Sequence, residues 1–200
     1  MKFKPMFAAQ RQASHRDVIS RLRRNEDGVT AIEFGLVAGP FLLFVLGIMA
    51  IGLQFFTINS LDHAVETASR KIRTGEAQKA ALKMGQFKEM VCQAGGTFLD
   101  DDCNKIIVHV QSAANWAGIV PTGCAENGNL TEQSDVNAGL ADSAGGAGQV
   151  VLVTVCYDWD MPIKFPYLKY ILMKPTDGVA LASGGALIQA VATFRTEPYD

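Results

Sequence analysis

The distribution of apolar and charged residues predicts one membrane-spanning helix near the N-terminus. No charged side chain occurs between positions 34 and 61, and the centre of this window, from Phe41 to Leu53, contains only apolar residues and glycine. A helix needs about 20 apolar residues to cross the hydrocarbon core of a bilayer. Because the window is longer than that, we predict a transmembrane helix over residues 29–61.

The same helix is expected to continue beyond the membrane, because an amphipathic pattern follows the apolar one. Apolar residues recur at helical spacing between Leu61 and Ile72, with charged residues around them, as in a helix that buries one face. Gly75 then suits a helix C-terminus. The pattern predicts one helix over residues 29–74. Its buried face would consist of Leu61, Ala64, Val65, Ala68 and Ile72.

The remaining residues predict an α+β head with one core and a small antiparallel sheet. A second helix is expected over residues 76–94. Strands are expected over residues 105–112, 150–157 and 186–195, and the second of these is apolar on both faces, which is typical of a central strand. The apolar face of the second helix would consist of Ala80, Met84, Phe87 and Val91.

Two segments of the head show no regular pattern. Residues 117–149 are polar and rich in glycine, and we expect a long loop there, of a length that is usually functional or mobile. Residues 161–178 combine three prolines with apolar and aromatic side chains, and the prolines disfavour regular structure. We interpret this second segment as a cover for the sheet. The alternative is a patch that binds a partner or a membrane surface.

Charge is distributed unevenly on the two sides of the predicted membrane helix. Residues 1–28 contain seven Lys and Arg against three Asp and Glu, whereas the rest of the chain is acidic overall. Basic flanks stay on the cytoplasmic side of a membrane. We therefore expect residues 1–28 in the cytoplasm of a bacterium, the helix in its inner membrane and a head of residues 62–200 in the periplasm. An acidic head argues against binding to nucleic acid.

A cleaved secretory signal peptide is the alternative to a membrane anchor. Such peptides have an apolar region of about 7–15 residues that ends at a small-x-small cleavage site. The residues Ala50-Ile51-Gly52 match this site loosely, but Leu53, Phe55 and Phe56 extend the apolar stretch beyond it. The length of the stretch favours an anchor.

Three residues at the start of the apolar region point to proteolytic processing. Gly28 ends the polar leader, Val29 begins the apolar run, and Glu33 stands inside that run at the fifth position from Val29. A protease that cuts after Gly28 would create an α-amino group about one helical turn from Glu33. The carboxylate could neutralise that amine, or the amine of a neighbouring subunit, inside the membrane. The alternative is that Glu33 lies at the level of the lipid headgroups and reaches water.

These residues resemble those of a known family. A basic leader, a glycine at the cut, a glutamate at the fifth mature position and an apolar helix are similar to the class III signal peptides of type IV pilins and pseudopilins. The run from Asp27 to Ile48, DGVTAIEFGLVAGPFLLFVLGI, resembles the TadE-like proteins of tight-adherence (Flp) pili. The residues TFRTEPY, Thr193 to Tyr199, are similar to the Arg-x-Glu-Pro ending of the same family.

The resemblance implies a pilin-like fold and a structural role. Such a chain would be a minor pilin or pseudopilin, matured by a prepilin peptidase that cuts between Gly28 and Val29, and used to assemble an adhesive type IV pilus. Its partners would be the peptidase, other pilins and pseudopilins, the pilus assembly platform and the inner membrane. The mature chain could also enter the pilus. The alternative function is that of an unprocessed, single-pass periplasmic binding or adaptor protein.

The predicted membrane helix also contains residues suited to close contact with another helix. Gly35 and Gly39 form a Gly-x-x-x-Gly step, which lets helices approach closely in lipid. Pro40 cannot donate its backbone hydrogen bond, so a kink or a local loosening is expected there. Glycine and proline are also common in membrane helices without such a role, and both interpretations stay open.

All four cysteines follow the predicted membrane helix, which predicts two disulfides in an oxidising compartment. Four cysteines allow three pairings, and we favour the pairing of sequence neighbours. A Cys92–Cys103 bond would join the second helix to the first strand, and the TadE-like resemblance also implies a pair at these positions. A Cys124–Cys156 bond would tie the long loop to the central strand, where a link restricts the most chain freedom.

No group of residues predicts catalysis, a metal site or a cofactor. The histidines at positions 15, 63 and 109 are far apart in the sequence, and we expect each to be solvated. The chain contains no Cys-x-x-C motif of the kind that binds zinc. The acidic turn at residues 100–102 has too few ligands at alternate positions for a calcium loop. We therefore expect a protein that is not an enzyme.

Overall fold

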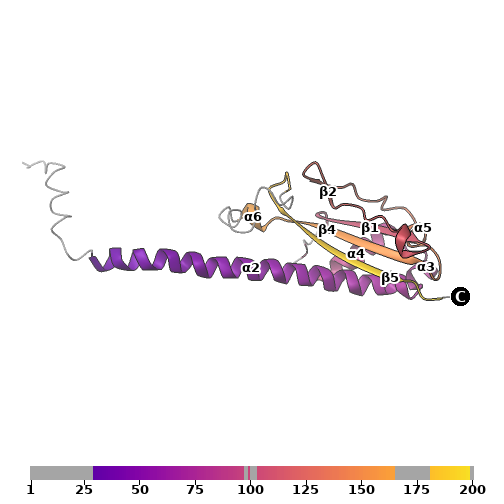
Figure 1. Ribbon diagram of the computed structural model, residues 1–200, viewed down its shortest axis with the longest axis horizontal. Coiled ribbons are helices and arrows are strands. Elements are labelled where there is room, and N and C mark those ends of the chain that lie inside the picture. The colour runs from indigo at the N-terminus through magenta and orange to yellow at the C-terminus, as the bar shows by residue number, and fades with distance from the viewer. Residues whose placement is uncertain (1–28, 97–98, 100–102, 165–180, 199–200) are drawn as a thin grey trace, which may run out of the picture. The chain divides into compact units, whose positions relative to one another are not determined.

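The computed structural model describes residues 29–96, 99, 103–164 and 181–198. The chain divides into two compact units, residues 1–46 and 47–200, and helix α2, Val29–Arg73, contributes to both (Figure 1). The other described elements belong to the second unit. They are α3 (Glu76–Lys79), α4 (Met84–Gly95), β1 (Ile106–Ala113), η3 (Trp116–Gly118), β2 (Ala125–Glu126), β3 (Asn129–Leu130), α5 (Leu140–Ala144), β4 (Val150–Trp159), α6 (Met161–Lys164) and β5 (Ala186–Arg195).

The part of α2 in the first unit presents apolar side chains to its surroundings. Four neighbouring residues, Ile32, Phe34, Leu36 and Val37, each keep 70–74% of their surface exposed. The helix is not interrupted at Pro40. A helix that is apolar on all sides requires either a protein core or lipid around it, and no described residue of the first unit covers these side chains.

The part of α2 in the second unit buries one face and ends where the sequence predicted. All five apolar residues of the predicted stripe, from Leu61 to Ile72, are at most 3% exposed. The helix ends at Arg73, and Gly75 follows it with φ of 76°, in the left-handed region that glycine adopts easily. The long helix predicted over residues 29–74 is thus confirmed.

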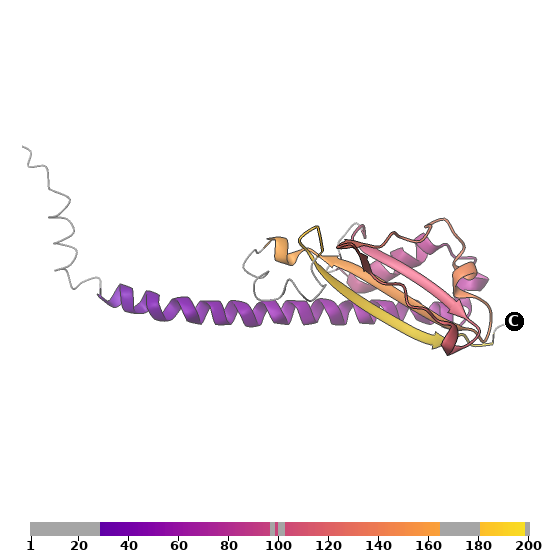
Figure 2. The ribbon, with the colours of Figure 1, turned by 45° about the horizontal axis from the view of Figure 1, so that its top comes forward.

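Strands β1, β4 and β5 form one antiparallel sheet in the order β1-β4-β5, which confirms the α+β fold class (Figure 2). The register pairs Val108 with Val155 and Val155 with Ala190. Side chains that are paired in this way lie on the same face of a sheet. The middle strand β4 is buried along nearly its whole length, as the apolar run at residues 150–157 predicted.

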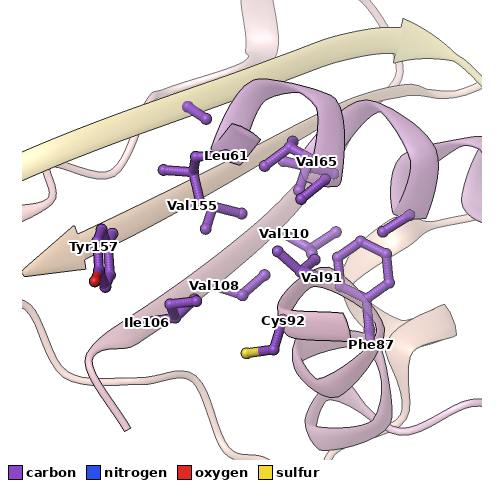
Figure 3. Packing of buried hydrophobic residues seen from close by; sticks show 14 of the residues in the cluster. Leu61, Val65, Phe87, Val91, Cys92, Ile106, Val108, Val110, Val155 and Tyr157 are labelled. Carbon is purple, nitrogen blue, oxygen red and sulfur yellow. The ribbon is translucent and has the colours of Figure 1, made fainter. Parts of the chain in front are cut away.

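One hydrophobic core lies between this face of the sheet and the helices α2 and α4 (Figure 3). Leu61 and Val65 enter it from α2, and Phe87 and Val91 enter it from α4. Phe87 is fully buried and is among the largest buried side chains of the chain. The second half of α2 is therefore part of the core of the head.

The helix predicted over residues 76–94 is broken into α3 and α4, so the prediction of one continuous helix was wrong. Lys83 has extended backbone angles and forms a β-bridge with Gly139. The Met84 N–H donates to the Ala138 carbonyl, and the Leu140 N–H donates to the Leu82 carbonyl. These bonds to a distant loop replace helical ones. As a result Ala80, expected on the buried face, is exposed.

The segment 117–149, expected to be an irregular loop, contains a hairpin and a short helix. Strands β2 and β3 pair across Asn127 and Gly128, whose φ angles of 53° and 79° match a tight two-residue hairpin turn. An Asn-Gly pair favours this turn because both residues tolerate positive φ. The Asn-Gly pair was visible in the sequence. The hairpin was missed because the flanking residues show no longer alternation of apolar and polar positions.

Residues 117–149, the covering segment, lie over the outer face of β1 and β4, which is the face opposite the core. The Cys124–Cys156 disulfide links it to β4. The side-chain amide of Gln133 donates to the Val108 carbonyl and accepts from the Val108 N–H, which occupies the free edge of β1. His109 is 8% exposed and lies within 2.9 Å of the Thr131 hydroxyl. The expectation that His109 is solvated was therefore wrong.

The segment 161–178 begins with the short helix α6, which the expectation of irregular structure did not include. Pro162 stands in the first turn, where its missing N–H breaks no helical hydrogen bond. The Asp160 carboxylate accepts from the ammonium groups of Lys105 (3.1 Å) and Lys164 (2.9 Å), and these contacts hold α6 near the start of β1. Residues 165–178 lie outside the described residues.

Replacing Phe87 with alanine should destabilise the head strongly. Truncation of a fully buried phenylalanine typically costs about 3–5 kcal/mol, since it removes buried apolar surface and leaves a cavity. Denaturant unfolding of the full chain in detergent, followed through the fluorescence of buried Trp159, measures the loss. The control is Trp116→Ala, because Trp116 is 62% exposed and its removal should change stability by less than about 0.5 kcal/mol. Equal losses for both variants would contradict the core described above.

The stability of the head should fall as the pH drops below about 6.5. Burial lowers the pKa of His109 from its ordinary value of 6.5, so the folded state favours the neutral imidazole. That contribution is fully present above the unfolded pKa and is lost as the imidazole is protonated. Free energies of unfolding measured between pH 7.5 and 5.5 give the size of this His109 contribution. The variant His109→Asn should lose most of this dependence, and His63→Asn, at an exposed position, should retain it; the reverse pattern would contradict the assignment.

Candidate functional site

The first candidate site is Glu33, the single acidic residue in the apolar part of α2. Because α2 begins at Val29, Glu33 occupies the fifth helical position. It is exposed, and its neighbours Ile32 and Phe34 are exposed as well. The chain therefore presents one carboxylate on an apolar helix surface, which is costly in lipid unless a positive group accompanies it or water reaches it.

The predicted cleavage site lies immediately before α2. Gly28 is outside the described residues, so the structure says nothing of its conformation. Val29 is the first helical residue. A new α-amino group on Val29 would stand at the N-terminus of the helix, one turn from the Glu33 carboxylate.

Gly35 and Gly39 leave an open strip on the surface of the same helix. A side-chain carbon at either position would meet no atom within 4 Å. Residues four positions apart lie on one face of a helix, and Pro40 adjoins this face. Within the described residues of the first unit, nothing covers this strip. Its use as a helix contact stays a prediction.

One described helix is long and apolar enough to cross a membrane. It spans Thr30–Arg73, and its most apolar window of 18 residues has a mean hydropathy of 2.5, with 6% of that window buried. This agrees with a single-pass membrane anchor near the N-terminus. The amphipathic half of the helix, by contrast, belongs to the core of the head.

The structure pairs Cys92 with Cys103 and Cys124 with Cys156, which is the connectivity favoured from the sequence. The first bond connects α4 with the residues that precede β1. The second connects the covering segment with the centre of the sheet. Both bonds are intact and no described cysteine is free, as expected for a head in an oxidising compartment.

A second candidate site, which sequence reasoning missed, is a groove of about 1180 Å³ between α2 and β5. Its α2 side carries Asp62, Glu66 and Arg70, and its β5 side runs from Val191 to Phe194. Ser69 also lines it and is 3% exposed, and its hydroxyl has no hydrogen-bond partner in the described part of the chain. The two sides are more than 100 residues apart in the sequence, so no local pattern could have revealed the groove.

One end of this groove is closed by contacts between the ends of α2 and β5. The Arg73 guanidinium lies 3.3 Å from the Glu197 carboxylate, and the Glu197 N–H donates to the Arg73 carbonyl at 2.8 Å. Asp62, Glu66 and Arg70 form no ion pair among the described residues and are exposed. The open part of the groove thus contains charges available to another molecule.

Among the described residues, no group of three His, Cys, Asp or Glu side chains is arranged to hold a metal ion. His109 contacts Thr131 and the hydroxyl of Ser134, at 3.5 Å, but it is buried beneath the covering segment. These three residues therefore belong to the packing of the head.

Comparison with known proteins agrees with the N-terminal part of this description. Residues 28–70 match the family model of the TadE-like proteins. No curated protein and no solved structure matches the chain. The matched residues include Gly28, Val29 and Glu33, and they extend into the amphipathic half of α2. The segment that contains the predicted cleavage site and the membrane helix is therefore TadE-like, as the sequence predicted.

Proposed function

We propose that this chain is a minor pilin or pseudopilin of a tight-adherence (Flp-type) pilus, with no catalytic activity of its own. The observation that carries the proposal is the start of α2. An apolar helix begins directly after Gly28 and exposes one carboxylate at its fifth position, inside the segment that matches the TadE-like family. A plain anchor needs the apolar helix, but it needs neither a glycine at this boundary nor a carboxylate at this position.

In this proposal a prepilin peptidase in the inner membrane removes residues 1–28 on the cytoplasmic side. A residue without a side chain suits a narrow peptidase cleft, and Gly28 supplies it. The cut exposes the α-amino group of Val29. The basic leader stays in the cytoplasm, and the disulfide-bonded head lies in the periplasm.

The charge pair then connects maturation with assembly. Before the cut, the Glu33 carboxylate has no cation near it on α2, since the helix carries none before Arg70. After the cut, the amine of this chain or of an adjacent pilin neutralises it within the membrane. A charge pair in lipid fixes the axial position of neighbouring helices, and the strip at Gly35 and Gly39 permits their close approach. The pilus assembly platform would receive the mature chain in this state.

Substitution of Gly28 with leucine should prevent maturation. The larger side chain would obstruct the cleft of the peptidase, so the chain should keep its leader. Mass spectrometry of the protein from cells with an active prepilin peptidase measures the N-terminus. The control Asn25→Leu places the same side chain in the leader away from the cut and should be processed normally. Normal processing of the Gly28 variant would place the cut elsewhere.

Substitution of Glu33 with glutamine should leave membrane insertion intact but impair incorporation into the pilus assembly. The amine of the matured chain would then lack its partner, and an unpaired buried charge costs about 3–5 kcal/mol. Cross-linking to other pilins and counting of surface pili measure the effect. The matched control Glu89→Gln alters an exposed residue of α4 and should behave like the parent. If the Glu33 variant supports normal piliation, the pairing role is wrong; an intact leader in cells with an active peptidase would instead favour an unprocessed periplasmic adaptor.

A further inference from the structure

The outer edge of β5 carries backbone groups that have no partner among the described residues. Hydrogen-bonding direction alternates along a strand, and the Thr196 N–H donates to the Gln149 carbonyl, just before β4. Even-numbered residues of β5 therefore face β4, and odd-numbered ones face away. Among the described residues, the outward N–H and C=O groups of Leu187, Gln189, Val191 and Thr193 form no hydrogen bond.

The two edges of the sheet differ at one position of the β1 edge, Val108. At the β1 edge, the Gln133 amide occupies both outward groups of Val108. The β5 edge has ten residues, contains no proline and no lysine, and leaves Val191 49% exposed. Proteins commonly protect such an edge with proline, lysine or a covering segment. An unprotected edge of this length is suited to the addition of another strand.

The groove lies where the side chains of an added strand would point. A strand paired with β5 extends the sheet over α2, so every second side chain of that strand would enter the groove above Glu66 and Arg70. The buried hydroxyl of Ser69 is an unpartnered polar group in the same groove. A polar lining of this kind selects charged or polar side chains over apolar ones.

The spacing of the two charges matches the repeat of a strand. Glu66 and Arg70 are four residues apart on α2, a rise of about 6 Å. Side chains on one face of a strand repeat every two residues, or about 6.6–6.8 Å. In both views α2 and β5 run in the same direction within the second unit (Figures 1 and 2). An antiparallel partner of β5 would therefore pass Arg70 before Glu66, with an acidic residue first and a basic residue two positions later.

A second copy of this chain does not satisfy these conditions. Antiparallel pairing of two β5 edges would point the two α2 helices in opposite directions, and two copies inserted alike in one membrane cannot do so. Pairing of β5 with the β1 edge of another copy is obstructed by Gln133. Neither the described residues of this chain nor a second copy inserted alike supplies such a strand, so we take a different polypeptide as the occupant.

We propose that the β5 edge and the adjoining groove bind an extended segment of another protein as an additional antiparallel strand. The segment carries an acid-x-base sequence on the side that faces α2, so that its acid pairs with Arg70 and its base pairs with Glu66. Strand addition supplies backbone hydrogen bonds, and the two ion pairs supply register. The site does not depend on cleavage after Gly28.

Binding of a synthetic peptide to the full chain in detergent micelles tests the proposal. The probe is a fluorescein-labelled nine-residue peptide of alternating Val and Thr with Glu-x-Lys at its centre, measured by fluorescence anisotropy. It should bind at least threefold more tightly than the same peptide with Lys-x-Glu. The variant Glu66→Lys with Arg70→Glu should reverse this preference. If no peptide binds, or if the preference stays unreversed, the proposal is wrong.

The backbone contribution is tested separately with Val191→Pro. Proline removes one outward N–H and leaves the ladder with β4 complete, so it should weaken binding at least tenfold. The control Val191→Thr keeps the N–H and should bind like the parent. A peptide methylated on the amides that face β5 should also fail to bind, and this result requires no folded proline variant. Equal binding of the methylated peptide would overturn strand addition.

Peptide binding at β5 and cleavage after Gly28 can succeed or fail independently. The variant Gly28→Leu should bind the peptide as well as the parent does, because the groove lies entirely in the second unit. Loss of peptide binding would therefore leave the maturation results unchanged, and an uncleaved chain would leave peptide binding unchanged.

Discussion

The structure depends on the burial of one stripe of α2 beneath the sheet. Leu61, Val65 and Ile72 are fully or almost fully buried, and removal of these side chains from water contributes about 5–9 kcal/mol at about 1.5–3 kcal/mol each. The whole stability of a domain is about 5–15 kcal/mol. The head therefore cannot keep its core without the second half of α2, and the same helix supplies the candidate membrane span and a core element.

The outer face of the sheet, opposite the core, is covered only in part. The covering segment is attached through the Cys124–Cys156 bond and through Gln133 and His109, so it covers β4 and occupies the Val108 position of the β1 edge. It does not reach the far edge of β5, where Val191 and Thr193 stay exposed. The two edges of the sheet are therefore unequally covered. The less covered edge, that of β5, lies beside the charged groove at the side of the head that adjoins α2.

Those parts of the fold that follow from local periodicity could be predicted from the sequence. The helix from Val29, the burial of Leu61 to Ile72 and the three strands of the sheet each rest on a regular pattern that tertiary contacts did not override. The break at Lys83 and the burial of His109 could not be predicted, since both arise from contacts with a segment that has no such pattern. The Asn127-Gly128 turn was a usable local pattern, but its strands are only two residues long.

The candidate sites divide in the same way. Gly28, Val29 and Glu33 stay predictions, which the sequence allows because their proposed chemistry depends only on spacing along the chain. The groove at Glu66 and Arg70 depends on β5, which joins the sheet from the other end of the chain, so only the folded arrangement shows it.

The central claim is that the exposed carboxylate in the apolar helix acquires its positive partner when the leader is removed. Intact-mass spectrometry of the protein purified from the membrane of its own host tests this most directly. The account predicts a chain that begins at Val29 with a free α-amino group. A working protein that still carries residues 1–28 would contradict it.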